Sequence, residues 1–293
     1  MEPTLIFRNT PSLRNLTISN TSFERGVPAL HVHLGNLERL TFILYNFTPN
    51  EVLPSIRNTA STLRELELGY LAHVELPVRG VGQATIELPQ LRKLTLSHSH
   101  REAMIRHESI LTRITAPKLE CLHVVGKMNT GEVESVREFL QASGCATNVE
   151  ELAMDGTRFD KWLQCVALIG ELTSLRTLAI HDLSWRIRGL DPLLKVLIRT
   201  TEVGPRAPLP RIDGEHAPES FSLTVCPRLR RLELECLPLS SQILEDMVRS
   251  RIRDSNGDDD LSAVSYSLDE LVLRRRELDA GDLDLKWSEE LKQ

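Results

Sequence analysis

The sequence predicts a single α/β solenoid in which short parallel strands line a concave face and helices cover the convex face. Leucine accounts for 49 of the 293 residues, about 17%, which is well above ordinary usage. The pattern L-x-x-L-x-L, with conservative replacements, occurs nine times, and amphipathic stretches separate the copies. A strand–helix unit of this size cannot bury its own apolar side, so the units are expected to stack.

The nine copies of the pattern define the strands. In the copy LRELEL, Leu66 and Leu68 point to one side of a short strand and Glu65 and Glu67 to the other, because side chains alternate along a strand. Start-to-start intervals are 24, 26, 28, 28, 30, 26, 54 and 39 residues. The copies begin at Leu13 (LRNLTI), Leu37 (LERLTF), Leu63 (LRELEL), Leu91 (LRKLTL), Leu119 (LECLHV), Val149 (VEELAM), Leu175 (LRTLAI), Leu229 (LRRLEL) and Leu268 (LDELVL).

Amphipathic stretches between the copies predict the helices. They span 50–60, 107–115, 131–142, 160–170, 190–199 and 241–252. The run Thr48-Pro49-Asn50-Glu51 is a capping box with proline at the first helical position, and Asp191-Pro192 repeats the start signal. Arg249, Arg251 and Arg253 are expected to complement the dipole at the end of the last helix.

On these motifs, residues 11–285 resemble a leucine-rich-repeat protein of the irregular, helix-backed kind. The mode of irregularity is similar to the C-terminal repeat region of fungal F-box-like proteins, although no F-box is visible. The resemblance implies a right-handed leucine-rich-repeat solenoid, or horseshoe, of about nine irregular repeats in one domain spanning 1–293. Six repeats keep the family's further apolar residue, namely Phe23, Phe47, Phe159, Trp185, Leu239 and Leu278.

The chain departs from the family pattern at the ninth position of each repeat, where asparagine or cysteine is expected. A side-chain ladder that satisfies backbone groups is therefore expected to be missing or patchy, which makes the solenoid locally softer. The residues found instead are Thr21, Tyr45, Leu71, Ser99, Lys127, Thr157, Leu183, Leu237 and Arg276.

Two interruptions and the two ends stand out. The 54-residue interval is twice a normal repeat, and its proline-rich stretch 203–222 predicts an inserted loop, either a tolerated surface insertion or a docking segment. Residues 254–260 (DSNGDDD) predict an acidic loop. The first strand begins near Met1 without an obvious cap, so either a repeat face is exposed or a preceding domain is absent. At the other end, Leu285, Trp287 and Leu291 could form a short cap.

Composition argues against several classes of partner. The net charge of −6 and the pI near 5.9 give no general attraction to nucleic acid or anionic lipid, so neither is expected as a partner. Neither a signal peptide nor a membrane span is visible. Five cysteines, an odd number with no C-x-x-C pair, indicate reduced thiols and a cytoplasmic or nuclear location.

No motif for an enzyme is found, and no cofactor or metal is expected. The phosphate-binding, nucleophile-elbow and zinc-protease motifs are all missing from the sequence. His98, His100 and His107 lack a carboxylate or thiol at ligand spacing. Cys121 and His123 lie two apart on one side of the fifth strand and resemble half of a nucleophile–base pair, but no glycine turn that could form an oxyanion hole accompanies them.

The remaining candidate is the concave face, formed by the third, fifth and seventh residues counted from each repeat's first leucine. It carries four bases and seven acids, which is the opposite of a nucleic-acid channel. Mixed charge suits a selective protein interface, and it equally suits a merely soluble surface. The candidate protein-binding residues are Arg39, Glu65, Glu67, Lys93, His123, Glu151, Asp155, His181, Arg231, Glu233, Glu235 and Arg274.

The sequence therefore favours a non-enzymatic module that binds protein partners through its concave face or inserted loops. The resemblance implies substrate recognition for a cullin-type ubiquitin ligase, with adaptor binding only if an F-box exists outside this chain. One alternative is a regulator of a small GTPase, like the repeat proteins that activate Ran, although Arg25 and Arg39 lack the surrounding motifs. A repeat fragment of an innate sensor is the third reading.

Overall fold

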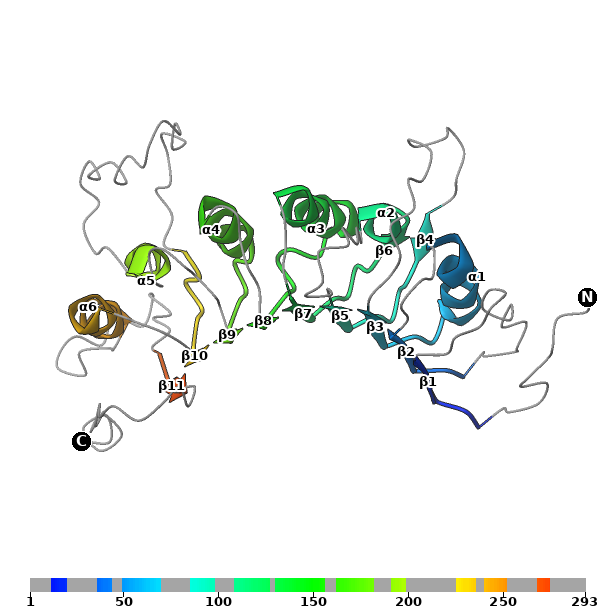
Figure 1. Ribbon diagram of the computed structural model, residues 1–293, viewed down its shortest axis with the longest axis horizontal. Helices are drawn as coiled ribbons and strands as arrows, with labels where there is room; N and C mark the ends of the chain where they lie inside the picture. The colour runs from blue at the N-terminus through cyan, green and yellow to red at the C-terminus, as the bar shows by residue number, and fades with distance from the viewer. Residues whose placement is uncertain are drawn as a thin grey trace, which may run out of the picture.

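The computed structural model describes residues 12–19, 36–43, 49–69, 85–97, 108–126, 130–155, 162–181, 191–198, 225–235, 240–251 and 268–274. Within these ranges the chain forms an α/β fold built on an open, nine-stranded parallel sheet (Figure 1). The sheet is bent into an arc, with the helices on its outer side. The face opposite the helices is the concave face, and its residues define the candidate site.

Each of the nine predicted strands is confirmed, and each begins at the third residue of its L-x-x-L-x-L copy. The strands lie in chain order across the sheet. They are β1 (Asn15–Ser19), β2 (Arg39–Ile43), β3 (Glu65–Gly69), β5 (Lys93–Ser97), β7 (Cys121–Val125), β8 (Glu151–Asp155), β9 (Thr177–His181), β10 (Arg231–Glu235) and β11 (Glu270–Arg274).

All nine strands share one register, so equivalent residues of the repeats face each other. The backbone N–H groups of Glu38 and Arg39 both donate to the carbonyl oxygen of Arg14, at 2.7 and 2.9 Å, and the same forked bond recurs at every step of the sheet. The 54-residue interval does not disturb it, because Arg231 of β10 lies directly opposite Thr177 of β9. The third, fifth and seventh residues therefore form three continuous rows across the concave face.

Leucines at the first, fourth and sixth positions of the copies build one continuous core between the sheet and the helices. Those of the central strands are fully buried, whereas Leu16 on β1 retains 9% exposure and Leu271 and Leu273 on β11 are only partly buried. Burying an aliphatic side chain contributes about 1.5–3 kcal/mol. The middle of the sheet is therefore held more firmly than its two ends.

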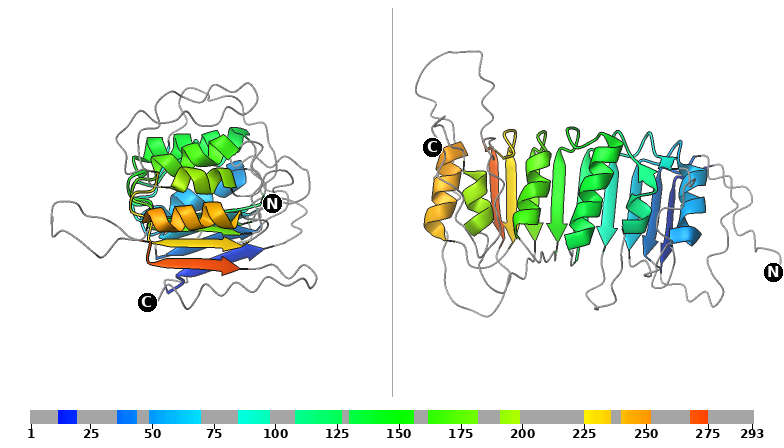
Figure 2. Two further views of the ribbon diagram at one scale, coloured as in Figure 1. Left: turned by 90° about the vertical axis from the view of Figure 1, so that its left-hand side faces the viewer. Right: turned by 90° about the horizontal axis from the view of Figure 1, so that it is seen from above.

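The described helices lie over the convex face in chain order, and each contacts the next (Figure 2). Their amphipathic sequences put one apolar stripe of each helix onto the sheet. They are α1 (Pro49–Thr59), α2 (Glu108–Leu111), α3 (Thr130–Ser143), α4 (Trp162–Glu171), α5 (Asp191–Leu197) and α6 (Ser241–Arg251).

The predicted helix over 107–115 is wrong in its second half. After α2 the chain forms a short strand, β6 (Ile114–Thr115), which pairs in parallel with β4 (Ile86–Glu87) on the convex side. In both segments apolar residues alternate with exposed or half-exposed ones, since Ile86, Leu88, Ile114 and Ala116 are all buried. This spacing of two residues favours a strand over a helix.

Arg249 and Arg251 both lie in the last turn of α6, as predicted, and Arg253 lies outside the described residues. The Arg251 side chain is almost completely buried and donates hydrogen bonds to backbone carbonyls of two other segments, which the sequence did not predict. By contrast Arg249, on the same helix, is exposed and pairs with Glu245 one turn earlier, as a solvated helix end predicts.

Several predictions fall outside the described residues. These are the inserted loop over 203–222, the acidic loop over 254–260, the ninth-position residues, the six further apolar residues, and the C-terminal cap. In the described part of the chain, no helix is both long and apolar enough to cross a lipid bilayer.

Candidate functional site

The structure brings all the predicted site residues onto the concave face. For Asp155 and Arg274, which end β8 and β11, it describes the backbone position only. The third-position row holds Arg39, Glu65, Lys93, Glu151 and Arg231. The fifth-position row holds Glu67, His123 and Glu233, and the seventh-position row holds Asp155, His181, Glu235 and Arg274.

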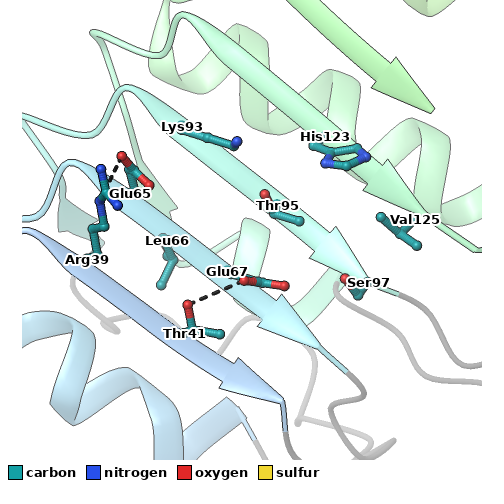
Figure 3. Close-up of a pocket in the computed structure, with 10 residues that line it drawn as sticks. All are labelled: Arg39, Thr41, Glu65, Leu66, Glu67, Lys93, Thr95, Ser97, His123 and Val125. Carbon is teal, nitrogen blue, oxygen red and sulfur yellow. Dashed lines mark hydrogen bonds and ion pairs between the residues drawn. The ribbon is translucent and has the colours of Figure 1, made fainter. Parts of the chain in front are cut away.

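A hollow of about 270 Å³ lies on the N-terminal half of this face, over β2, β3, β5 and β7 (Figure 3). Its lining is mostly polar and contains both acids and bases. The lining residues are Arg39, Thr41, Glu65, Leu66, Glu67, Lys93, Thr95, Ser97, His123 and Val125.

Some charged groups at the hollow already have a partner within the protein. Arg39 Nε lies 3.0 Å from Glu65 Oε1, and the hydroxyl of Thr41 donates to Glu67 Oε2 at 3.3 Å (Figure 3). Lys93 is exposed and forms no ion pair with any described residue. Its ammonium is therefore a cation that an approaching molecule can pair with.

A second cluster crosses β9, β10 and β11. The carboxylate of Glu233 lies 3.0 Å from His181 Nε2 through one oxygen and 3.0 Å from Arg231 through the other, while Arg231 also lies 2.7 Å from Glu270. The Glu233 side chain is only 7% exposed although it lies on the concave face. Its hydrogen bond, together with the charges of both glutamates, raises the pKa of the Arg231 guanidinium. The cluster ties the last three strands together.

Cys121 does not have the properties of a catalytic thiol. Burial, reinforced by the negative charge of Glu151 on the next strand, raises the pKa of the Cys121 thiol to about 12. The thiolate is the nucleophilic form, so at neutral pH this thiol stays protonated. This is the opposite of the lowered thiol pKa by which a neighbouring histidine would activate a nucleophilic cysteine.

The described residues contain no group of three or more histidine, cysteine, aspartate or glutamate side chains that could hold a metal ion. His98, His100 and His107, which were considered as ligands, lie outside the part of the chain that the structure describes. The described side chains of the concave face interact with one another through hydrogen bonds and ion pairs.

Sequence reasoning missed a charged row along the edge of the sheet where the strands begin. It is formed by the second residue of each copy, and neighbours of opposite sign pair across the strands. The pairs are Arg14–Glu38 at 2.5 Å, Arg92–Glu120 at 2.8 Å, Arg176–Glu150 at 3.5 Å and Arg230–Asp269 at 3.8 Å. Exposed pairs of this kind contribute about 0–1 kcal/mol each, so their effect is on register more than on stability. Aligning the second residues of the nine copies would have revealed the row.

No model of a protein family, no curated protein and no solved structure matches the chain. The fold and site define an α/β protein with an open, bent parallel sheet, one face of which is covered by helices while the other presents charged and polar side chains.

Proposed function

We propose that this protein is a non-enzymatic leucine-rich-repeat module, a right-handed solenoid that binds a protein partner on its concave face. The observation that carries the proposal is the common register of nine strands, which gives a continuous surface that none of the described helices covers. Nine strands about 4.8 Å apart, each about 16 Å long, offer a face of roughly 600 Å². One partner in a standard protein interface buries about 800 Å², so the face is of suitable size.

The cellular context we propose is substrate recognition for a cullin-type ubiquitin ligase, with the adaptor bound through an F-box outside this chain. This cellular context rests on the resemblance of the irregular repeats to the C-terminal repeat region of fungal F-box-like proteins. A cytoplasmic or nuclear location is supported by the free thiols of Cys121, Cys145 and Cys226, because reducing compartments keep thiols unpaired. Nucleic acid and membranes are not the proposed partners.

The alternative of a Ran-type GTPase activator gains no support from the geometry. Arg39 is held in an ion pair with Glu65, and Arg25 lies outside the described residues. A GTP-hydrolysis assay with Ran is expected to show no acceleration by this protein. No described residue favours the third reading, a fragment of an innate sensor.

The concave face is tested by blocking its middle row. Ala179 lies in this fifth-position row on β9, between Ala153 of β8 and Glu233 of β10, and is 8% exposed, so Ala179→Arg places a long charged side chain midway along these strands. Partners captured from native extract by the wild-type protein should be lost with this variant and retained with Glu138→Arg, a control on the exposed side of α3. Thr177→Arg, at a half-exposed position two residues earlier, repeats the block if Ala179→Arg fails to fold. Partners retained by both blocking variants would refute the proposal.

A further inference from the structure

We propose that the partner segment bound by the concave face is an α-helix carrying one acidic and one basic side chain seven residues apart. The inference rests on the proposed function and adds the chemistry and shape of the partner. Two exposed residues carry it, Lys93 on β5 and Glu151 on β8, together with the small residues Ala153 and Ala179 beside them.

Lys93 and Glu151 are the charged residues of the third-position row that form no ion pair with another described residue, although the Glu151 carboxylate also accepts a hydrogen bond from the Cys121 thiol on the neighbouring strand. Its other described charges are neutralised by neighbours, Arg39 by Glu65 at 3.0 Å and Arg231 by Glu270 at 2.7 Å. Among the described residues, neither Lys93 nor Glu151 has an ion pair, and both are exposed. A partner that desolvates this row must supply an anion to one and a cation to the other, since an unpaired charge in an interface is costly.

The spacing of these two charges favours a helix. Only β7 lies between β5 and β8 in the sheet, so the backbones of Lys93 and Glu151 are two strand spacings apart, about 9.5 Å. On a helix, residues seven apart lie on one side and are separated by about 10.5 Å along the axis. On an extended chain, residues on one side are about 6.7 or 13.4 Å apart, and neither value matches.

The shape of the face agrees with a helix whose axis crosses the strands. Five-residue strands span about 16 Å, and a helix with its side chains is about 10–12 Å wide. Ala153 on β8 and Ala179 on β9 occupy neighbouring places in the fifth-position row, each 8% exposed, so the face is low beside Glu151. Partner residues at and beyond the position that pairs with Glu151 are expected to be small or apolar where they contact these alanines.

The test uses a displayed library of helical peptides about 20 residues long, a length at which an isolated helix can form. Selection against the wild-type protein should enrich peptides with an acid and a base seven residues apart. Selection against Lys93→Glu should enrich two bases at that spacing, and selection against Glu151→Lys should enrich two acids. Fluorescence anisotropy of a wild-type-selected peptide should show at least a roughly tenfold weaker Kd with either variant, equivalent to about 1.4 kcal/mol.

Matched controls make the same charge changes one residue earlier, on the edge row. Arg92→Glu and Glu150→Lys should leave both the selected pattern and the Kd unchanged, because Arg92 and Glu150 pair along the edge and not on the concave face. Binders that are lost with Ala179→Arg but show no charged pair would overturn this inference and leave the proposed function standing. A library that yields no binder also overturns it, whereas binders unaffected by Ala179→Arg and Thr177→Arg count against the proposed function as well.

Discussion

Arg251 joins three segments that are far apart in the sequence. Its guanidinium donates to the carbonyl oxygen of Leu197 at 2.7 Å, of Val225 at 2.8 Å and of Cys226 at 2.9 Å, while the residue is only 1% exposed. Leu197 ends α5, and Val225 and Cys226 precede β10. Cys226 has a φ of 50°, a left-handed conformation that residues other than glycine rarely adopt. One side chain therefore connects α6 to the end of α5 and to the residues that precede β10.

Replacing Arg251 with methionine should destabilise the protein on the order of 3 kcal/mol, because buried carbonyls left without a donor cost about 1–3 kcal/mol each. Arg251→Lys should give a stability between those of the wild-type protein and Arg251→Met, since an ammonium cannot reach the same three acceptors that lie in the plane of a guanidinium. The urea midpoint at constant slope measures the change. Arg249→Met is the control on the same helix, and it should shift stability by less than about 0.5 kcal/mol because Arg249 is exposed. Equal effects at the two positions would disprove the structural role of Arg251.

Cys121 gives a second prediction at a single residue. With its pKa raised from 9.0 to about 12, the thiol at pH 8 holds roughly a thousandfold less thiolate than an ordinary cysteine. Alkylation of Cys121 by iodoacetamide in the native protein should be slower than in the unfolded chain by about that factor, and should accelerate as pH rises. Quantifying the Cys121 peptide by mass spectrometry separates it from the other cysteines.

The Glu151 carboxylate supplies part of this shift, so its removal has a defined direction. Glu151→Gln takes away a negative charge that opposes ionisation, which lowers the pKa of Cys121 and speeds its alkylation. Glu235→Gln, on β10, is the matched control and should leave the rate unchanged. Unaltered reactivity in Glu151→Gln would show that burial alone sets the pKa.

At the scale of elements, the pair β4–β6 contributes to the convex layer in the same way as a helix. The N–H groups of Ile86 and Leu88 donate to the carbonyls of Arg113 and Thr115, both at 2.8 Å, and their side chains enter the core. The amide of Ala116 continues the connection by donating to the hydroxyl of Ser143 at the end of α3, at 3.0 Å. In these two repeats, a strand of only two residues is thus enough to cover the core on its convex side.

Truncating Ile114 to alanine should cost about 2–4 kcal/mol, since it removes a fully buried aliphatic side chain and leaves a cavity. Thr115→Ala, one residue later and half-exposed, should cost less than about 1 kcal/mol. Urea unfolding of the two variants gives the comparison. If both changes cost the same, Ile114 is not part of the continuous core and the assignment of β6 to the convex layer fails.

The elements differ in how well the sequence predicts them, and the reason is the length of the pattern. A strand with apolar residues at fixed fourth and sixth positions repeats nine times, so its register and its exposed rows could be predicted together. The stretch 113–116 has only two alternating apolar residues, Ile114 and Ala116, which a helix of similar length can also accommodate. No local signal marks Arg251 as buried, because its three acceptors are 25 to 54 residues away in the chain.

The contacts of the candidate site also fall into those that the sequence can predict and those that it cannot. The pair Arg39–Glu65 joins equivalent residues of successive copies, so aligning the copies is enough to predict it. The contact between His181 and Glu233 joins the seventh-position row to the fifth-position row, and it depends on side-chain conformations that alignment does not give. The hollow and the buried state of Glu233 follow from such conformations and could not be predicted from the sequence.

For the molecule as a whole, contacts run almost entirely between neighbouring units. Among the described residues, each strand of the large sheet pairs with the strands beside it, and the helices contact one another in chain order from α1 to α6. Stability in such an array is approximately a sum of unit and neighbour terms. A defect in a central unit weakens two interfaces, whereas a defect at an end weakens one.

Leu122 on β7 and Leu16 on β1 occupy the same position of their copies, so they test this directly. Leu122 is fully buried, and Leu122→Ala should cost about 2–5 kcal/mol and raise hydrogen exchange at the amides of both β5 and β8. Leu16 is 9% exposed and has a described neighbouring strand on one side, so Leu16→Ala should cost less and raise exchange at β1 and β2 alone. Native-state hydrogen exchange read strand by strand distinguishes the two patterns. If Leu16→Ala raised exchange at β8 and β9 as much as at β1 and β2, the fold would be one cooperative unit, and coupling between neighbouring repeats would not describe its stability.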